Sequence, residues 1–267
     1  MDETRIAQML GANATTVFFA TLATLLLAVA LGWRLLRRVE RGFQNTPLPP
    51  AHLLLLRMAL GFAVVVAAGF SFAELAEELN VSDDMGRFDV ALSEALRQNV
   101  SGDVLQLFAL VTRLGDVSTL TGLCIVVGVA LLAASSRRLA LAWVLAVAGN
   151  GTLNRLLKAV FERVRPVYDH ELISASGWSF PSGHSSGSVV AYGMLAYVVV
   201  HFVSPRWQLP LLLLAAALAL TVGFSRVFLQ VHYLSDVLAG FASGLLWLTI
   251  CIVSSEWWHS RRRAAGS

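Results

Sequence analysis

Three short polar segments in the C-terminal half of the chain carry residue types suited to phosphate chemistry. Together they offer cations that can bind phosphate oxygens, a helix start that can bind an anion, and an imidazole beside a carboxylate. In chain order the residues are Lys158 and Arg165-Pro166; Pro181-Ser182-Gly183-His184; and Ser225-Arg226, His232 and Asp236.

The cations of this set are Lys158, Arg165 and Arg226. Lys158 is the only lysine in the chain, and the other basic residues are arginines. An arginine grips phosphate oxygens with two prongs, whereas a lysine adds a point charge, so the two are not interchangeable. The alternative is that these side chains reach out to lipid headgroups. Arg155 and Arg163 fit no part of the pattern, and for them the headgroup or a supporting role is the better interpretation.

The segment Pro181-Ser182-Gly183-His184 has the composition of a helix start. Pro and Ser suit the first turn, Gly lets a backbone approach an anion, and free N–H groups there bind phosphate. A plain helix cap by Ser182 is the alternative, but it leaves His184 unexplained.

His232 and Asp236 are four residues apart. We expect them on one face of a helix, one turn apart. A carboxylate beside an imidazole fixes its tautomer, which a histidine nucleophile or base requires. The alternative is a buried polar pair that joins two helices.

Composition indicates the class of protein that must position these residues. Hydrophobic residues make up 57% of the 267 positions and charged residues 14%, against about 45–50% and about 25% in soluble domains. This excludes a disordered chain, argues against a soluble enzyme and favours a membrane protein with several spans. The net charge of +3 does not suggest nucleic-acid binding. Cys124 and Cys251 lie in apolar runs, where we expect small buried hydrophobes rather than a disulfide or a metal site.

The predicted fold is all-α, a transmembrane bundle of about seven spans with short amphipathic helices on its surface. The first apolar run is too long for a signal peptide, and basic residues follow rather than precede it. Phe88 to Val111 is amphipathic and interrupted near Gly102, so we expect one or two helices there on the outer membrane surface. The predicted spans are Ala14–Trp33, Leu53–Ala73, Ser118–Ala134, Leu139–Asn154, Ser185–Val203, Leu209–Phe224 and Val237–Val253.

Arginine placement predicts the orientation of the bundle. With seven spans, four arginine-bearing stretches fall on one side, which the positive-inside rule makes the cytoplasm. The N-terminus is then outside and the C-terminus inside. All three polar segments fall at the outer ends of spans, so residues distant in sequence converge at one membrane face. The stretches hold Arg34, Arg37, Arg38 and Arg41; Arg137 and Arg138; Arg206; and Arg261, Arg262 and Arg263.

These three segments resemble the signature of the type 2 phosphatidic acid phosphatase family, with every position filled and every internal spacing kept. The resemblance covers about residues 53–255 and implies a metal-independent membrane phosphatase without a cofactor. It implies that His232 attacks phosphorus to form a phosphohistidine and that Asp236 orients His232. It also implies that His184 protonates the leaving oxygen and then activates water for hydrolysis. It further implies that Lys158, Arg165, Ser182, Gly183 and Arg226 hold phosphate, supported by Pro166, Pro181 and Ser225. Soluble haloperoxidases that hold vanadate share the signature, but seven apolar spans disfavour that alternative.

The chain divides into three expected parts. Residues 1–52 form an extra N-terminal span with a cytoplasmic linker, 53–255 the phosphatase core and 256–267 a basic cytoplasmic tail. We expect a bacterial inner-membrane protein with its site on the periplasmic or extracellular side, acting on a lipid phosphate. Undecaprenyl diphosphate is the first choice of substrate, with glycerophospholipid phosphates and lipid A next. A phosphotransferase of the same family and a non-catalytic lipid-phosphate binder or transporter are the alternatives. The oligomeric state stays open.

Overall fold

The computed structural model describes residues 3–44, 50–79, 83–166, 172–173 and 175–265. Over these residues the protein consists of helices and their connections, without a strand, so the predicted all-α class is confirmed. The helices are α1 (Glu3–Ala12), α2 (Ala14–Gln44), α3 (Pro50–Glu77), α4 (Asp84–Asn99), α5 (Gly102–Thr112), a 3₁₀ turn (Arg113–Gly115), α6 (Val117–Ala133), α7 (Arg137–Phe161), α8 (Gly183–Val199), α9 (Pro205–Phe228) and α10 (Leu234–Ala265).

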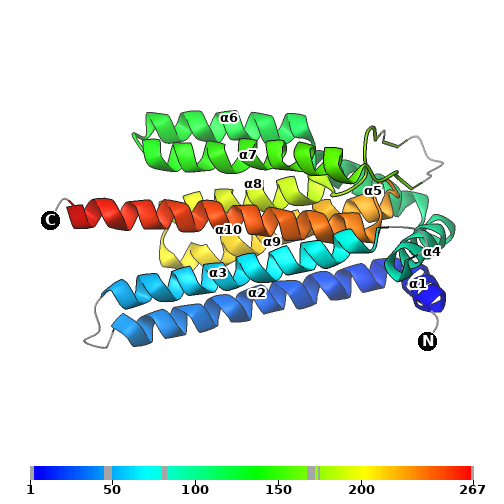
Figure 1. Ribbon diagram of the computed structural model, residues 1–267, viewed down its shortest axis with the longest axis horizontal. Coiled ribbons are helices and arrows are strands. Elements are labelled where there is room, and N and C mark those ends of the chain that lie inside the picture. Colours follow the sequence, from blue (N-terminus) through cyan, green and yellow to red (C-terminus); the bar gives the residue numbers. More distant parts are fainter. Residues whose placement is uncertain (1–2, 45–49, 80–82, 167–171, 174, 266–267) are drawn as a thin grey trace.

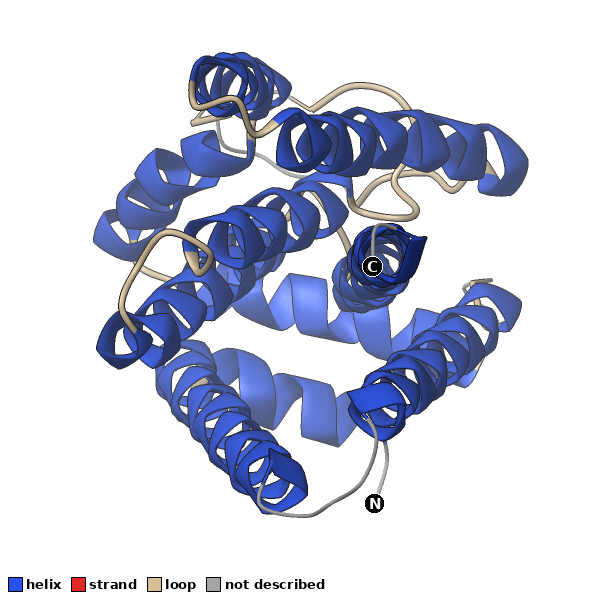
Figure 2. Ribbon diagram, turned by 90° about the vertical axis from the view of Figure 1, so that its left-hand side faces the viewer, coloured by secondary structure: helices blue, strands red, loops and turns tan. Residues whose placement is uncertain are grey.

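The long helices run side by side along the longest axis, and their ends alternate between two faces of the bundle (Figure 1). One face holds the C-terminal end of α10 and the connections from α6 to α7 and from α8 to α9. The opposite face holds the start of α8, the connection from α9 to α10, and α1 and α4, which lie across the bundle (Figures 1 and 2). The three polar segments therefore meet at one face, as their predicted positions at the span ends require.

Each of the seven predicted spans coincides with a helix, but not all of these helices have the length and apolar composition that a bilayer span requires. Among the described residues, four helices are long and apolar enough: α2, α3, α9 and α10. The pair α5 and α6, bent by 42°, adds a fifth if it is one span. α6 and α8 have 17 residues each, short of the about 20 that a span requires, and α7 carries polar residues along its length. The number of spans therefore stays a prediction.

α2 and α3 form the most exposed wall of the bundle. Only 6% of the apolar window of each is buried within the protein. Their exposed side chains are large and apolar, among them Leu35, Phe62 and Phe70. Such a surface suits contact with lipid rather than with water.

α8 and α10 lie in close contact at the face that holds the polar segments. A Cβ at Gly240 would lie 2.6 Å from the carbonyl oxygen of Ser182, and one at Gly244 would lie 2.8 Å from that of Ser186. Small residues four apart on one helix let two backbones approach in a membrane bundle. This contact brings the first turns of α8 and α10 together, and both turns carry site residues.

α5 is joined to the bundle through an aromatic side chain. Its Phe108 stacks on Phe228 of α9, with ring centroids 4.3 Å apart, and meets Phe18 of α2 edge-on at 5.4 Å. α5 then continues through the 3₁₀ turn into α6. Phe108 thus attaches α5 to two helices of the bundle, whereas Leu107 and Leu110 of α5 stay exposed.

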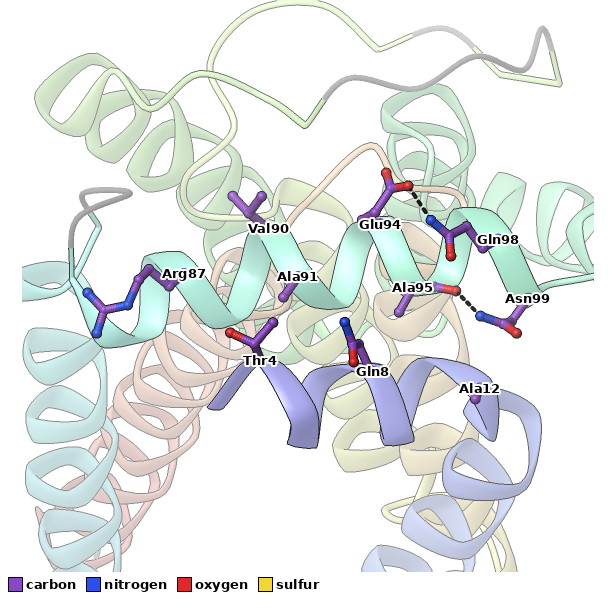
Figure 3. Close-up of a pocket in the computed structure, with 10 residues that line it drawn as sticks. All are labelled: Thr4, Gln8, Ala12, Arg87, Val90, Ala91, Glu94, Ala95, Gln98 and Asn99. Carbon is purple, nitrogen blue, oxygen red and sulfur yellow. Dashed lines mark hydrogen bonds between the residues drawn. The ribbon is translucent and has the colours of Figure 1, made fainter. Parts of the chain in front are cut away.

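α1 was not foreseen, since it is short and its sequence is only weakly apolar. Ala7 is fully buried, in a cluster with Leu92 and Leu96 of α4, Val227 of α9 and Val237 of α10. α1 and α4 border a pocket of about 650 Å³ (Figure 3). None of the ten residues that line it belongs to the three polar segments, so this pocket is separate from the predicted site.

Candidate active site

His232 lies in the connection between α9 and α10, and Asp236 lies in the first turn of α10. Nδ1 of His232 is 3.3 Å from Oδ2 of Asp236, and both side chains are buried. The predicted pairing is therefore confirmed, but the prediction that one helix carries both residues is wrong, because α10 begins at Leu234. The pair meets because Asp236 also accepts the N–H of Tyr233 at 2.9 Å, which folds the connection back over the helix start.

The contacts of His232 fix its tautomer. Nη1 of Arg165 lies 3.0 Å from Nε2 of His232. A guanidinium can only donate, so Nε2 is the acceptor and the ring proton is on Nδ1, facing Asp236. Burial lowers the pKa of His232 to about 3 despite the opposing charge of Asp236. The imidazole is therefore neutral, with the lone pair of Nε2 directed at the cation that would bind phosphate.

Arg165 is held in place by backbone carbonyls. Its Nη1 donates to the carbonyl of Val231 at 2.6 Å and its Nε to that of Gly177 at 2.9 Å. These bonds tie the loop after α7 to the connection that carries His232. The guanidinium is thus oriented by the chain before any anion arrives.

The two other predicted cations come from different helices. Nζ of Lys158, near the end of α7, donates to the carbonyl of Ser179 at 3.2 Å and to that of Trp178. Arg226, in the last turn of α9, is buried and donates to Oγ1 of Thr112 at 2.8 Å. The charges of Arg165 and Arg226 both act on Lys158 and on His232. The three cations are therefore gathered around one position.

The start of α8 forms as its sequence predicts. Ser182 caps the helix by accepting the N–H of Ser185 at 3.3 Å, and its own N–H donates to the carbonyl of Asp236 at 2.9 Å. Gly183 follows at the first helical position, where a Cβ would come within 2.9 Å of Oδ1 of Asn154. Asn154 in turn donates to the carbonyl of Pro181 at 3.3 Å. The predicted anion-binding turn is thus joined to the His232–Asp236 pair.

His184 has a partner that its sequence neighbourhood does not supply. Its Nε2 lies 3.0 Å from Oδ1 of Asp116, the residue that precedes α6. Gly115 makes this approach possible, because a Cβ there would lie 2.9 Å from the imidazole and 2.5 Å from Val222. The carboxylate beside His184 therefore comes from a distant segment of the chain.

The remaining predicted residues have supporting positions. Pro166 and Pro181 are buried. Ser225 is fully buried and donates to the carbonyl of Val222 in its own helix at 2.6 Å.

Arg155 and Arg163, which fitted no part of the pattern, differ from each other. Arg155 is exposed on α7. Arg163 donates to Oδ1 of Asp236 at 2.7 Å and to Oδ2 of Asp89 at 2.9 Å, so it has the supporting role. Ser179 also donates to Asp236. Sequence reasoning missed Asp89, Asp116 and Ser179, because their partners lie on distant elements and no local spacing indicates them.

Known proteins resemble this chain in sequence and in fold. The profile of the PAP2 superfamily matches residues 139–260, a range that contains the three polar segments. Phosphatidylglycerophosphatase B of Bacillus subtilis is 37% identical over 139 residues, which are 51% of this chain and 68% of that protein. The lipid A 1-phosphatase of Rhizobium etli is 34% identical over 104 residues, 36% of this chain and 41% of that protein. The crystal structure of a transmembrane PAP2 type phosphatidylglycerolphosphate phosphatase from Bacillus subtilis aligns with a TM-score of 0.67 at 30% identity, over 72% of this chain and 96% of that one.

Proposed function

We propose that this chain, which belongs to the PAP2 superfamily and is a membrane lipid phosphatase, hydrolyses its substrate through a phosphohistidine on His232 without a metal ion. The observation that carries the proposal is the arrangement around one imidazole: Asp236 on Nδ1, and Arg165 at 3.0 Å from Nε2. A neutral ring with Nε2 facing a phosphate-binding cation suits a nucleophile.

In the first step, the lone pair of Nε2 attacks phosphorus and the bond from phosphorus to the leaving oxygen breaks. His184 in its protonated form gives its proton to that oxygen. Burial and the charge of Arg226 lower the pKa of His184 to about 4, and the carboxylate of Asp116 at 3.0 Å opposes this shift by favouring the protonated ring. Lys158, Arg165 and Arg226 stabilise the charge on the phosphoryl oxygens.

In the second step, water replaces the histidine on phosphorus. His184, now neutral, takes a proton from the attacking water, and the bond between Nε2 and phosphorus breaks. Inorganic phosphate leaves, and His232 and His184 return to their starting protonation states.

The substrate we propose is a glycerophospholipid that ends in a phosphate monoester. The Bacillus subtilis relative is named a phosphatidylglycerophosphatase, and the Rhizobium etli relative a lipid A 1-phosphatase. Both names place a phosphate on a membrane lipid. Undecaprenyl diphosphate, the first choice from sequence, also carries a terminal phosphate, but through an anhydride bond, and it is the alternative substrate in the test.

We also propose that the site faces the outer side of a bacterial inner membrane. The arginines at the ends of α2, α7 and α9 belong to the face of the bundle opposite the site (Figure 1). The positive-inside rule assigns that arginine-rich face to the cytoplasm.

The experiment is phosphate release from purified protein in detergent–lipid micelles, with phosphatidylglycerophosphate, phosphatidic acid, undecaprenyl diphosphate and lipid A offered separately. We expect release from the glycerophospholipid phosphates, and none by the His232→Ala variant. Water labelled with ¹⁸O should place one label in each released phosphate. Lipid binding without release would indicate a binder, and transfer of phosphate to a second lipid without the label would indicate a phosphotransferase.

A further inference from the structure

A buried ionic network lies behind the His232–Asp236 pair, with Arg163 at its centre. Arg163 follows α7 and donates from Nη1 to Oδ1 of Asp236 at 2.7 Å and from Nη2 to Oδ2 of Asp89 at 2.9 Å. The side chain of Asp89 is fully buried, and that of Arg163 is 9% exposed. The guanidinium also lies over the ring of Tyr233, 4.5 Å from its centroid. One cation thus joins the catalytic carboxylate to a carboxylate on α4.

Ser235 closes the network on the side of α10. Its N–H donates to Oδ1 of Asp89 at 3.2 Å, and its hydroxyl donates to Oδ2 of Asp89. The same hydroxyl accepts from Nη1 of Arg163 at 2.6 Å. Asp89 therefore holds the residue that directly precedes Asp236, in addition to the arginine that contacts its carboxylate.

α4 is itself fixed at this position. Leu92 and Leu96, one and two turns after Asp89, pack against Val237 of α10 and against Ala7 of α1. At Gly11 of α1, a Cβ would lie 2.4 Å from that of Ala95. α4 is thus packed against both α1 and α10, and this packing holds Asp89 in a defined position.

The cost of such a network points to a role in orientation. A buried ion pair adds little net stability compared with well-packed apolar side chains, because its charges lose their hydration. Planar guanidinium and carboxylate groups that are hydrogen-bonded at several atoms do fix geometry. Here the geometry that they fix is that of the catalytic carboxylate.

We propose that Asp89 is a positioning residue for the phosphatase reaction. Acting through Arg163 and Ser235, it holds the carboxylate of Asp236 in the orientation that keeps Nε2 of His232 directed at phosphorus. The proposal rests on the proposed function of the His232–Asp236 pair.

The test is a double-mutant cycle between Asp89→Asn and Asp236→Asn, with kcat and KM measured on the preferred lipid phosphate. Asp89→Asn keeps the size of the side chain but loses its charge. We expect kcat to fall roughly 10- to 100-fold, the range for residues that orient a catalytic group. KM should stay close to that of the wild type, because the phosphate-binding cations are unchanged. The double variant should be no slower than Asp236→Asn alone, because residues that act as one unit are not additive.

The matched control is Glu94→Gln, which removes an exposed carboxylate from the same helix and should leave kcat unchanged. If Asp89→Asn fails to fold, Ser235→Ala runs the same cycle, because it removes the hydroxyl between Asp89 and Arg163. Wild-type kcat in Asp89→Asn, or losses that multiply in the double variant, would overturn the proposal. Absence of turnover by the wild-type protein would instead overturn the proposed function, so the two failures are distinguishable.

Discussion

Asp116 and His184 are 68 positions apart in the chain, yet Oδ1 of the first lies 3.0 Å from Nε2 of the second. The carboxylate precedes α6 and the imidazole lies in the first turn of α8. Gly115 permits this contact, because it has no side chain to separate the 3₁₀ turn from the histidine. The two motif histidines of this protein therefore each have a carboxylate.

Replacing Asp116 by Asn should slow the hydrolysis of a lipid phosphate, because a neutral amide no longer favours the protonated form of His184. We expect kcat to fall by about 10- to 100-fold, less than the roughly 100- to 10,000-fold that a positioned proton donor contributes, because His184 itself remains. An aryl phosphate, whose leaving group needs no proton, should be affected less. The measurement compares kcat for both substrates in the variant and in Asp103→Asn, which changes an exposed carboxylate on α5. Equal losses with both substrates would contradict the role of Asp116.

The two histidines should differ in the step that they block. His232→Ala should give neither turnover nor a phosphoenzyme, because it lacks the attacking nitrogen. His184→Ala should be slow with a lipid phosphate but should still form the phosphoenzyme from an aryl phosphate. Acid-sensitive phosphohistidine requires alkaline quenching, and trapping of radiolabelled phosphate on each variant makes the comparison. Label on His232→Ala would overturn the assignment.

The pH dependence should reflect a nucleophile that stays neutral. Burial lowers the pKa of His232 from about 6.5 to about 3. Protonation therefore removes the nucleophilic lone pair of this ring only in strong acid. From pH 8 down to pH 5, kcat/KM should therefore show no loss that is due to protonation of the nucleophile. The profile must be corrected for the second ionisation of the phosphate, near pH 6. A remaining acid limb near pH 6.5 would count against the buried, neutral imidazole.

Hydrolysis should survive an excess of chelator. In the proposed mechanism, Lys158, Arg165 and Arg226 supply the positive charge that a metal ion provides in other phosphatases. The measurement is phosphate release before and after dialysis against EDTA, with a magnesium-dependent phosphatase as the positive control for metal removal. Loss of activity that magnesium or zinc restores would show that the mechanism is wrong.

The predicted orientation can be tested with reporter fusions. A reporter after Gln44, at the end of α2, and one at the C-terminus should both lie in the cytoplasm, because arginines concentrate at that face. A reporter inserted after Asn99, at the end of α4, should lie on the opposite side. Any fusion with the reverse location would require another number of spans.

The apolar segments and the three motifs could be predicted from the sequence, because both signals are local. An uninterrupted apolar run such as Ala14–Trp33 indicates a helix without reference to the rest of the chain. The spacing from His232 to Asp236 likewise indicated their contact, although His232 lies before the helix and not on it.

The contacts between distant elements could not be predicted in this way. Asp89 and Asp116 lie in polar stretches, where a carboxylate gives no sign of a special role. Only the folded bundle brings them to Arg163 and His184. The packing of Phe108 in α5 could not be predicted for a related reason. The amphipathic pattern around Phe108 does not reveal that Phe18 and Phe228 complete an aromatic cluster there.

The hydrogen bond from the N–H of Ser235 to Asp89 joins residues 146 positions apart, so it can form only late in synthesis of the chain. A ribosome delivers Asp89 first, then Arg163, and delivers Ser235 and Asp236 only with the last helix. Until then Asp89 and Arg163 of the nascent chain lack their partners on α10, which are Ser235 and Asp236. Insertion of α10 is therefore the event that adds Asp236 to the Asp89–Arg163 pair and completes the active site.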